Sequence, residues 1–203
     1  MKFVEFSSKE LNKKCREWAG EIFAEFKPDL IVYIARAGYI LAQPMADTYG
    51  IPLLGIGAVR SGNSLKEFVG PLLAYVPSFV RRTLAFIELK SGLHKKNTER
   101  NVCFHQKIER LDCQSFYKIL IVDDAVDTGY TMKKVFDMTK EAFPNAQVRT
   151  ACMNVSCEEA EKVFQVDYVL LRGMSVKTPF SKDSKEYPAT KKRYYLETQN
   201  EYV

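Results

Sequence analysis

The sequence predicts an α/β fold in which helices cover both faces of a doubly wound, mostly parallel sheet. Short runs of branched apolar residues, too continuous for strands with one exposed face, alternate along the chain with segments of helical period. The clearest run is Ile-Leu-Ile-Val at residues 119–122. Strands that alternate with helices form parallel sheets with right-handed crossovers, and 203 residues can bury one sizeable core. We therefore expect residues 1–203 to form a single domain.

The N-terminal part of the chain has clear helix start and stop signals. Ser7 and Glu10 have the spacing of a capping box, which begins a helix with apolar residues every three or four positions. Those apolar residues are Leu11, Cys15, Trp18, Ile22 and Phe26. Pro28 ends this helix, and Gly50 ends the next one. The expected strands are residues 30–35 and 53–59, and the second helix is residues 38–49.

The C-terminal part continues the alternation. Its third helix is amphipathic, begins at Thr131 and is ended by Pro144. In chain order the expected elements are a strand at 118–122, a helix at 131–143, a strand at 148–155, a helix at 158–164 and a strand at 168–171. Together with the earlier strands, these three complete the predicted sheet.

Residues 60–116 interrupt the alternation, and we expect them to form an insertion within the domain. An apolar segment at residues 65–89 is predicted to be helical. Between Lys90 and Arg110 there are six Lys or Arg residues against two Glu, a composition typical of a basic loop. The insertion is therefore predicted to contain a helix and a basic, exposed loop.

Composition and charge exclude several classes of protein. A net charge of +5 is too small to indicate nucleic acid as a partner, and no run of eighteen apolar residues suggests a membrane span. The N-terminus lacks the apolar stretch of a signal peptide. Five scattered cysteines without C-x-x-C spacing are typical of reduced thiols, so we expect a cytoplasmic protein without a zinc site. The cysteines are Cys15, Cys103, Cys113, Cys152 and Cys157.

The most informative motif follows the apolar run at residues 119–122. Two carboxylates, Asp123 and Asp124, stand at the end of this strand, and a loop with Thr128, Gly129 and Thr131 then opens a helix. Backbone N–H groups at a helix N-terminus suit a phosphate, and threonine hydroxyls add donors. The carboxylates cannot hold a phosphate, so we expect them to face hydroxyl groups or a cation. A ribose 5-phosphate has both features.

This motif resembles the 5-phosphoribosyl-1-pyrophosphate (PRPP) motif of the type I phosphoribosyltransferases. The family pattern is an apolar strand, two acidic residues, three further residues and then Thr-Gly-x-Thr. The resemblance implies a PRPP site made by a continuous loop, in which Asp123 and Asp124 orient the ribose hydroxyls, directly or through a metal-bound water. The loop residues are Asp123, Asp124, Ala125, Val126, Asp127, Thr128, Gly129, Tyr130 and Thr131.

A second strand-to-helix turn contains Arg36, Ala37 and Gly38. Arg36 offers a permanent cation with several donors, and Gly38 is predicted to let the backbone approach an anion. In an open parallel sheet, ligands bind beyond the carboxyl ends of strands that send their crossovers to opposite faces. The turn resembles the pyrophosphate loop of the family, which implies that Arg36 stabilises the leaving pyrophosphate.

The resemblance also implies roles for residues near the base. In purine-specific members an aspartate at the position of Asp127 assists proton transfer at the base, although Asp127 has a second interpretation as the cap of the following helix. Residues 174–180 resemble the segment that covers the base, which implies base contacts by Val176 and Phe180. Residues 172–203 are then a small hood and a C-terminal tail.

Two departures from the family pattern concern the base. Ser175 stands where a stacking aromatic residue is usual, and Asn154-Val155-Ser156 stands where a lysine reads the oxygen of a 6-oxopurine. Asn154 is predicted to read a base edge instead. Hypoxanthine, guanine and xanthine are the first expected acceptors, followed by adenine or a non-purine base.

The resemblance thus implies transfer of the phosphoribosyl group of PRPP to a nucleobase, with Mg²⁺ as cofactor near Asp123 and Asp124. Asp127, Asp124, Asp123 and Arg36 are the predicted catalytic residues. In this family a mobile loop closes over the reacting centre, so the basic insertion is either such a loop or a solvated surface loop. The alternative function is a regulator that senses PRPP or nucleotides without catalysis. A homodimer is expected, with apolar residues 68–86 contributing to the contact.

Overall fold

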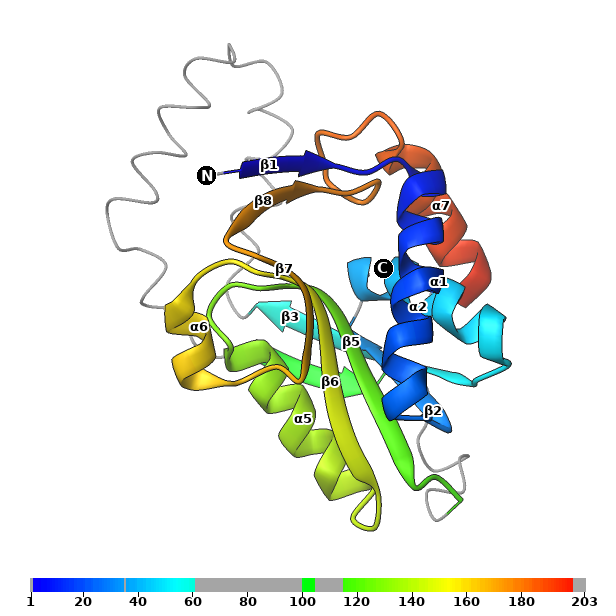
Figure 1. Ribbon diagram of the computed structural model, residues 1–203, viewed down its shortest axis with the longest axis vertical. Helices are drawn as coiled ribbons and strands as arrows, with labels where there is room; N and C mark the ends of the chain where they lie inside the picture. The colour runs from blue at the N-terminus through cyan, green and yellow to red at the C-terminus, as the bar shows by residue number, and fades with distance from the viewer. Residues whose placement is uncertain (1, 35, 61–99, 105–114, 199–203) are drawn as a thin grey trace. The chain divides into compact units, whose positions relative to one another are not determined.

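The computed structural model describes residues 2–34, 36–60, 100–104 and 115–198 (Figure 1). The chain divides into two compact units, one formed by Met1–Gly57 with Val102–Val203 and the other by Ala58–Asn101. The predicted helical segment at residues 65–89 and the apolar segment at 68–86 lie outside the described residues. Most of the predicted basic loop does too.

A six-stranded sheet with the order β4-β3-β2-β5-β6-β7 forms the centre of the fold. Four of its pairings follow the predicted class, because β2 pairs in parallel with β3 and β5, and β6 in parallel with β5 and β7. The strands are β2 (Leu30–Ile34), β3 (Leu53–Arg60), β4 (Arg100–Phe104), β5 (Lys118–Val126), β6 (Gln147–Val155) and β7 (Tyr168–Arg172). The α/β fold with a mostly parallel sheet is therefore confirmed.

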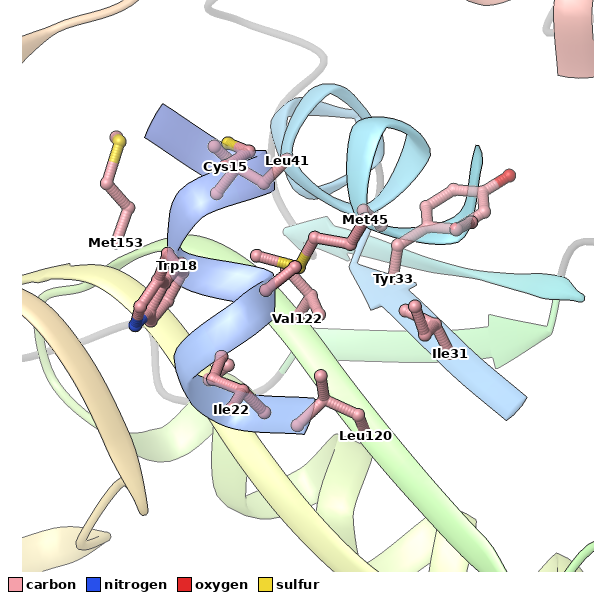
Figure 2. Packing of buried hydrophobic residues seen from close by; sticks show 14 of the residues in the cluster. Cys15, Trp18, Ile22, Ile31, Tyr33, Leu41, Met45, Leu120, Val122 and Met153 are labelled. Atoms are coloured by element: carbon pink, nitrogen blue, oxygen red, sulfur yellow. The ribbon is translucent and has the colours of Figure 1, made fainter. Parts of the chain in front are cut away.

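Helices pack on both faces of this sheet. On one face α1 and α2 bury a continuous cluster that includes Trp18, Leu41, Met45 and Val122 (Figure 2). Buried α5 residues such as Val135 belong to the opposite face, since alternate residues of each strand point to opposite sides. The helices are α1 (Ser8–Glu25), α2 (Ala37–Tyr49), α5 (Tyr130–Ala142), α6 (Glu158–Val163) and α7 (Tyr187–Thr198).

The predicted start of α1 and the predicted end of α2 are confirmed. The Ser7 hydroxyl accepts from the backbone N–H of Glu10, and the Glu10 carboxylate accepts from the backbone N–H of Ser7 at 2.9 Å, which is the reciprocal capping box. Gly50 follows α2 with φ +66°, the left-handed conformation that ends a helix. None of the described helices is long and apolar enough to cross a membrane.

A separate two-stranded parallel sheet lies beside the main one. It joins β1 (Lys2–Glu5) to β8 (Met174–Lys177), so the N-terminal strand pairs with a strand that lies late in the chain (Figure 1). The Phe6 N–H extends this pairing by donating to the Lys177 carbonyl at 3.0 Å. Gly173, with φ +62°, turns the chain between β7 and β8. Sequence analysis did not predict β1.

The C-terminal segment packs on the domain through its aromatic side chains. Tyr194 of α7 is only 1% exposed and makes an edge-to-face contact with Tyr39 of α2, at 5.4 Å between ring centroids. The Tyr39 hydroxyl donates to the Glu197 carboxylate at 2.8 Å. Tyr194 is therefore a packing group that fixes α7 to α2.

Candidate active site

The carboxyl ends of β2 and β5 bring the two predicted loops to the same edge of the sheet. Tyr33 and Val122 are partners in the register between these strands, so the loop that contains Arg36 and the acidic end of β5 begin at the same edge. From β2 the chain continues into α2 on one face, and from β5 into α5 on the other. This is the switch point at which open parallel sheets bind their ligands.

Gly38 brings the N-terminus of α2 against the end of β5. A Cβ atom at Gly38 would lie 2.8 Å from the Val122 carbonyl oxygen, closer than side chains pack. The predicted reason for this glycine was approach to an anion, whereas the observed reason is the close packing of helix and strand. Ala37 is the first residue of α2.

Arg36 is exposed at the N-terminus of α2. Its guanidinium lies 5.9 Å from the ring centroid of Tyr195 on α7, a cation–π distance. The Arg36 side chain makes no capping hydrogen bond to α2. It is therefore a cation at the sheet edge with donors that can reach an anion.

Asp123 and Asp124 lie within β5, because this strand continues to Val126 instead of ending at the predicted residue 122. Asp123 is 8% exposed, and its Oδ1 accepts from the backbone N–H of Asp124 at 2.9 Å. Burial raises the pKa of Asp124, and the charge of Asp127 raises it further, against the lowering effect of its hydrogen bond with Asp123. A cation or a set of hydroxyl groups beside Asp124 would favour its charged form.

Gly129 connects the acidic strand end to α5. Its φ is +78°, and a Cβ atom would lie 2.6 Å from the Ala160 carbonyl oxygen of α6. Gly129 is also the N-cap of α5, so the first N–H groups of this helix receive no side-chain cap. Such uncapped groups suit an anion. The alternative interpretation of Asp127 as the capping residue is wrong, because Gly129 occupies that position.

The residues around this loop form an acidic cleft of about 220 Å³. The end of β5, the end of β6, β8 and the segment after β8 all contribute to it. Its lining residues are Asp124, Ala125, Asp127, Met153, Asn154, Ser156, Met174, Ser175, Val176, Thr178 and Ser181. The cleft thus brings the predicted ribose-binding carboxylate Asp124 together with the predicted base-binding residues Asn154 and Val176.

Phe180 is not brought to the acidic cleft, although sequence analysis assigned it a base contact. Its ring packs edge-to-face on Tyr187 and Tyr194 of α7, with centroids 5.5 and 6.0 Å apart. Phe180 therefore anchors the segment after β8 to the C-terminal helix, in the main hydrophobic cluster. Ser175, at the position of the usual stacking residue, does line the cleft.

Asn154 links β6 to β8 and is 4% exposed. Its Nδ2 donates to the Met174 carbonyl at 2.9 Å. Its Oδ1 is buried and has no hydrogen-bond partner among the residues that the structure describes. An unsatisfied buried acceptor costs about 1–3 kcal/mol, so Asn154 Oδ1 is a candidate to accept a hydrogen bond from a ligand.

Ser156 is a functional candidate that sequence analysis did not select. Its hydroxyl donates to Asp127 Oδ1 at 2.5 Å, and its backbone N–H donates to the Val126 carbonyl at 3.1 Å. The neighbouring Cys157 thiol lies 3.5 Å from the Asp127 carbonyl oxygen. Asp127 is exposed to the cleft and held by these neighbours. Its position just after a predicted strand, at the edge where parallel sheets bind ligands, was the signal that could have identified Ser156 as a site residue.

The fold and this site define an α/β protein with a strand-to-helix loop and an acidic cleft at the edge where open parallel sheets bind ligands. Residues 7–185 match the family described as phosphoribosyl transferase domain. Because the match covers most of the chain, the protein belongs to this family and is a PRPP-dependent pentosyltransferase. No curated protein matches the chain at a significant level of sequence similarity.

Solved structures share the fold at low sequence identity. A purine phosphoribosyltransferase from Pyrococcus horikoshii is 19% identical, with a TM-score of 0.59 and 90% of this chain and 95% of that chain covered. A xanthine-guanine-hypoxanthine phosphoribosyltransferase from Helicobacter pylori is 15% identical, with a TM-score of 0.63 and coverage of 92% and 99%. A hypoxanthine-guanine phosphoribosyltransferase from Bacillus anthracis is 15% identical, with a TM-score of 0.52 and coverage of 82% and 80%.

Proposed function

We propose that this enzyme transfers the 5-phosphoribosyl group of PRPP to a purine base and releases pyrophosphate. One observation carries the proposal: a single cleft contains Asp124 and Asp127 of the phosphate loop together with Asn154 and Val176. A ribose held by the loop would therefore present its reacting carbon toward a base held under β8. The relatives named above for purine substrates agree with this choice of base.

We assign PRPP to the N-termini of α5 and α2 and to the carboxylates of Asp123 and Asp124. The uncapped N–H groups of α5, with the exposed Thr128, receive the 5-phosphate. Asp123 and Asp124 orient the ribose hydroxyls. As the bond to pyrophosphate breaks, Arg36 stabilises the negative charge that grows on the leaving group.

Mg²⁺ is the proposed cofactor, as is general in this family. The described residues contain no cluster of three side chains able to hold a metal. This fits Mg²⁺, which typically takes one or two carboxylates and completes its coordination with substrate phosphates and water. Asp123 and Asp124 would hold it, and the ion would supply positive charge against the phosphates.

Asp127 is proposed to accept the proton of the base as the new bond to nitrogen forms. It is exposed in the cleft, and the Ser156 hydroxyl fixes the direction of its carboxylate. Val176, on β8, is proposed to contact the base from above through its backbone. The parallel pairing of β8 with β1 supports this segment.

A pyrophosphate-release assay with PRPP, Mg²⁺ and a panel of bases tests the proposal. We expect turnover with at least one purine and none without a base. Turnover confined to pyrimidines would refute the purine assignment. Calorimetric binding of PRPP without turnover of any base would favour the regulatory alternative.

We further propose a cytoplasmic homodimer. The described free cysteines, Cys15, Cys152 and Cys157, are compatible with a reducing compartment. Burial raises the pKa of the Cys15 thiol to about 12, which makes it an inert core residue. The dimer is expected from the family and from apolar residues 68–86.

A further inference from the structure

We infer that the base used by this enzyme carries an exocyclic amino group, as a 6-aminopurine does, where 6-oxopurines carry a carbonyl oxygen. The inference rests on the proposed phosphoribosyl transfer and narrows its substrate class. It depends on the hydrogen-bonding groups that two residues at the carboxyl end of β6 offer to a ligand in the acidic cleft. Asn154 is the penultimate residue of this strand, and Ser156 is the first residue after it.

Asn154 offers an acceptor. Its Nδ2 donates to the Met174 carbonyl, which can only accept, so the amide cannot be flipped without loss of that bond. The orientation of the amide is thus set by the protein, and Oδ1 is left as the group without a partner among the described residues. Since Asn154 is almost fully buried, a ligand that supplies an N–H would relieve a group that water reaches poorly.

The Ser156 hydroxyl, like the Asn154 amide, is left with an acceptor for a ligand. A hydroxyl has one proton, and that of Ser156 is donated to the Asp127 carboxylate, which can only accept. The remaining capacity of Ser156 toward a ligand is therefore its lone pairs. Asn154 and Ser156 both line the acidic cleft.

The charged groups of the acidic cleft also favour a ligand that donates hydrogen bonds. Its described lining contains Asp124 and Asp127 and no lysine, arginine or histidine. A 6-oxo group would place oxygen lone pairs against these acceptors and leave Asn154 unsatisfied. An amino group brings two N–H donors. A site built to accept from a substrate N–H discriminates strongly against an analogue that lacks it.

Adenine and hypoxanthine are the matched probes, because they differ at the 6-substituent and the adjacent ring nitrogen. With PRPP and Mg²⁺, we expect kcat/KM for adenine to exceed that for hypoxanthine by about 100-fold or more. Asn154→Leu, which keeps the volume and removes the amide, is expected to reduce this ratio to below about tenfold. Asn12→Leu, the same exchange on α1 outside the cleft, should leave the ratio unchanged.

Two further measurements keep the inference testable if Asn154→Leu does not fold. Ser156→Ala should also reduce the adenine preference, and calorimetry should show tighter binding of AMP than of IMP to the wild-type protein. Equal use of the two bases, or a preference for hypoxanthine, overturns the inference while the phosphoribosyl transfer stands. If no base is turned over, the proposed function fails, and tighter binding of IMP, or equal binding, then overturns the inference as well.

Discussion

Replacing Gly129 with alanine is expected to destabilise the protein by roughly 2–4 kcal/mol. A non-glycine residue at its φ of +78° costs about 1–2 kcal/mol. The new Cβ would also lie 2.6 Å from the Ala160 carbonyl oxygen and 3.0 Å from Val163 Cβ, so α6 has to shift. Such overpacking costs about 1–3 kcal/mol, and alanine returns roughly 0.4–1 kcal/mol through a less flexible unfolded chain.

Gly50→Ala is the matched control, because Gly50 has a φ of +66° and nothing within 4 Å of the added Cβ. Its expected loss is about 1 kcal/mol from backbone strain alone. Urea unfolding with an unchanged m-value measures both losses, and in a chain of this size 1 kcal/mol corresponds to roughly 2–4 °C in Tm. Equal losses in the two variants would refute the close packing of α6 on Gly129.

Three further predictions concern the site and the assembly. Asp124→Asn should lower phosphoribosyl transfer by at least about 100-fold and yet raise Tm at pH 7. The raised pKa of Asp124 means that the folded state binds its proton more tightly, so wild-type stability falls as pH rises through that pKa. The gain in Tm should therefore shrink toward pH 4, and a loss of Tm at pH 7 would contradict it. Ser156→Ala should lower kcat about tenfold with an unchanged KM for PRPP, while Ser156→Thr, which keeps the hydroxyl, should restore kcat; an unaltered kcat in Ser156→Ala would refute the positioning of Asp127. Light scattering should give twice the chain mass of 23.3 kDa, and a monomer at micromolar concentration would contradict the dimer.

The main sheet and the helix termini were predictable because their signals are local. Four consecutive branched residues before Asp123, the capping box at Ser7 and the left-handed Gly50 each have one favourable structure. The order of these signals along the chain then restricts the topology to a parallel sheet. The same local chemistry identified Asp124 and Asp127, which lie in one cleft.

Features that depend on contacts between distant residues were not predictable. β1 has only four residues and is paired by β8, about 170 positions away. β5 continues through two aspartates because β6 pairs with Asp123 and, beyond Asp124, with Ala125 and Val126, although acidic residues are uncommon in strands. Gly38 is required by the Val122 carbonyl, and Phe180 packs on α7, neither of which is visible in spacing or composition.

The most direct test of the central account follows PRPP by ³¹P NMR in the presence of the enzyme, Mg²⁺ and a purine. If the acidic cleft joins a ribose site to a base site, the PRPP signals should decrease while those of pyrophosphate and a nucleoside 5′-monophosphate increase in equal amounts. The reaction should require the base and be lost in Asp124→Asn. PRPP that stays intact with every base, or is hydrolysed at the same rate without one, would contradict the account.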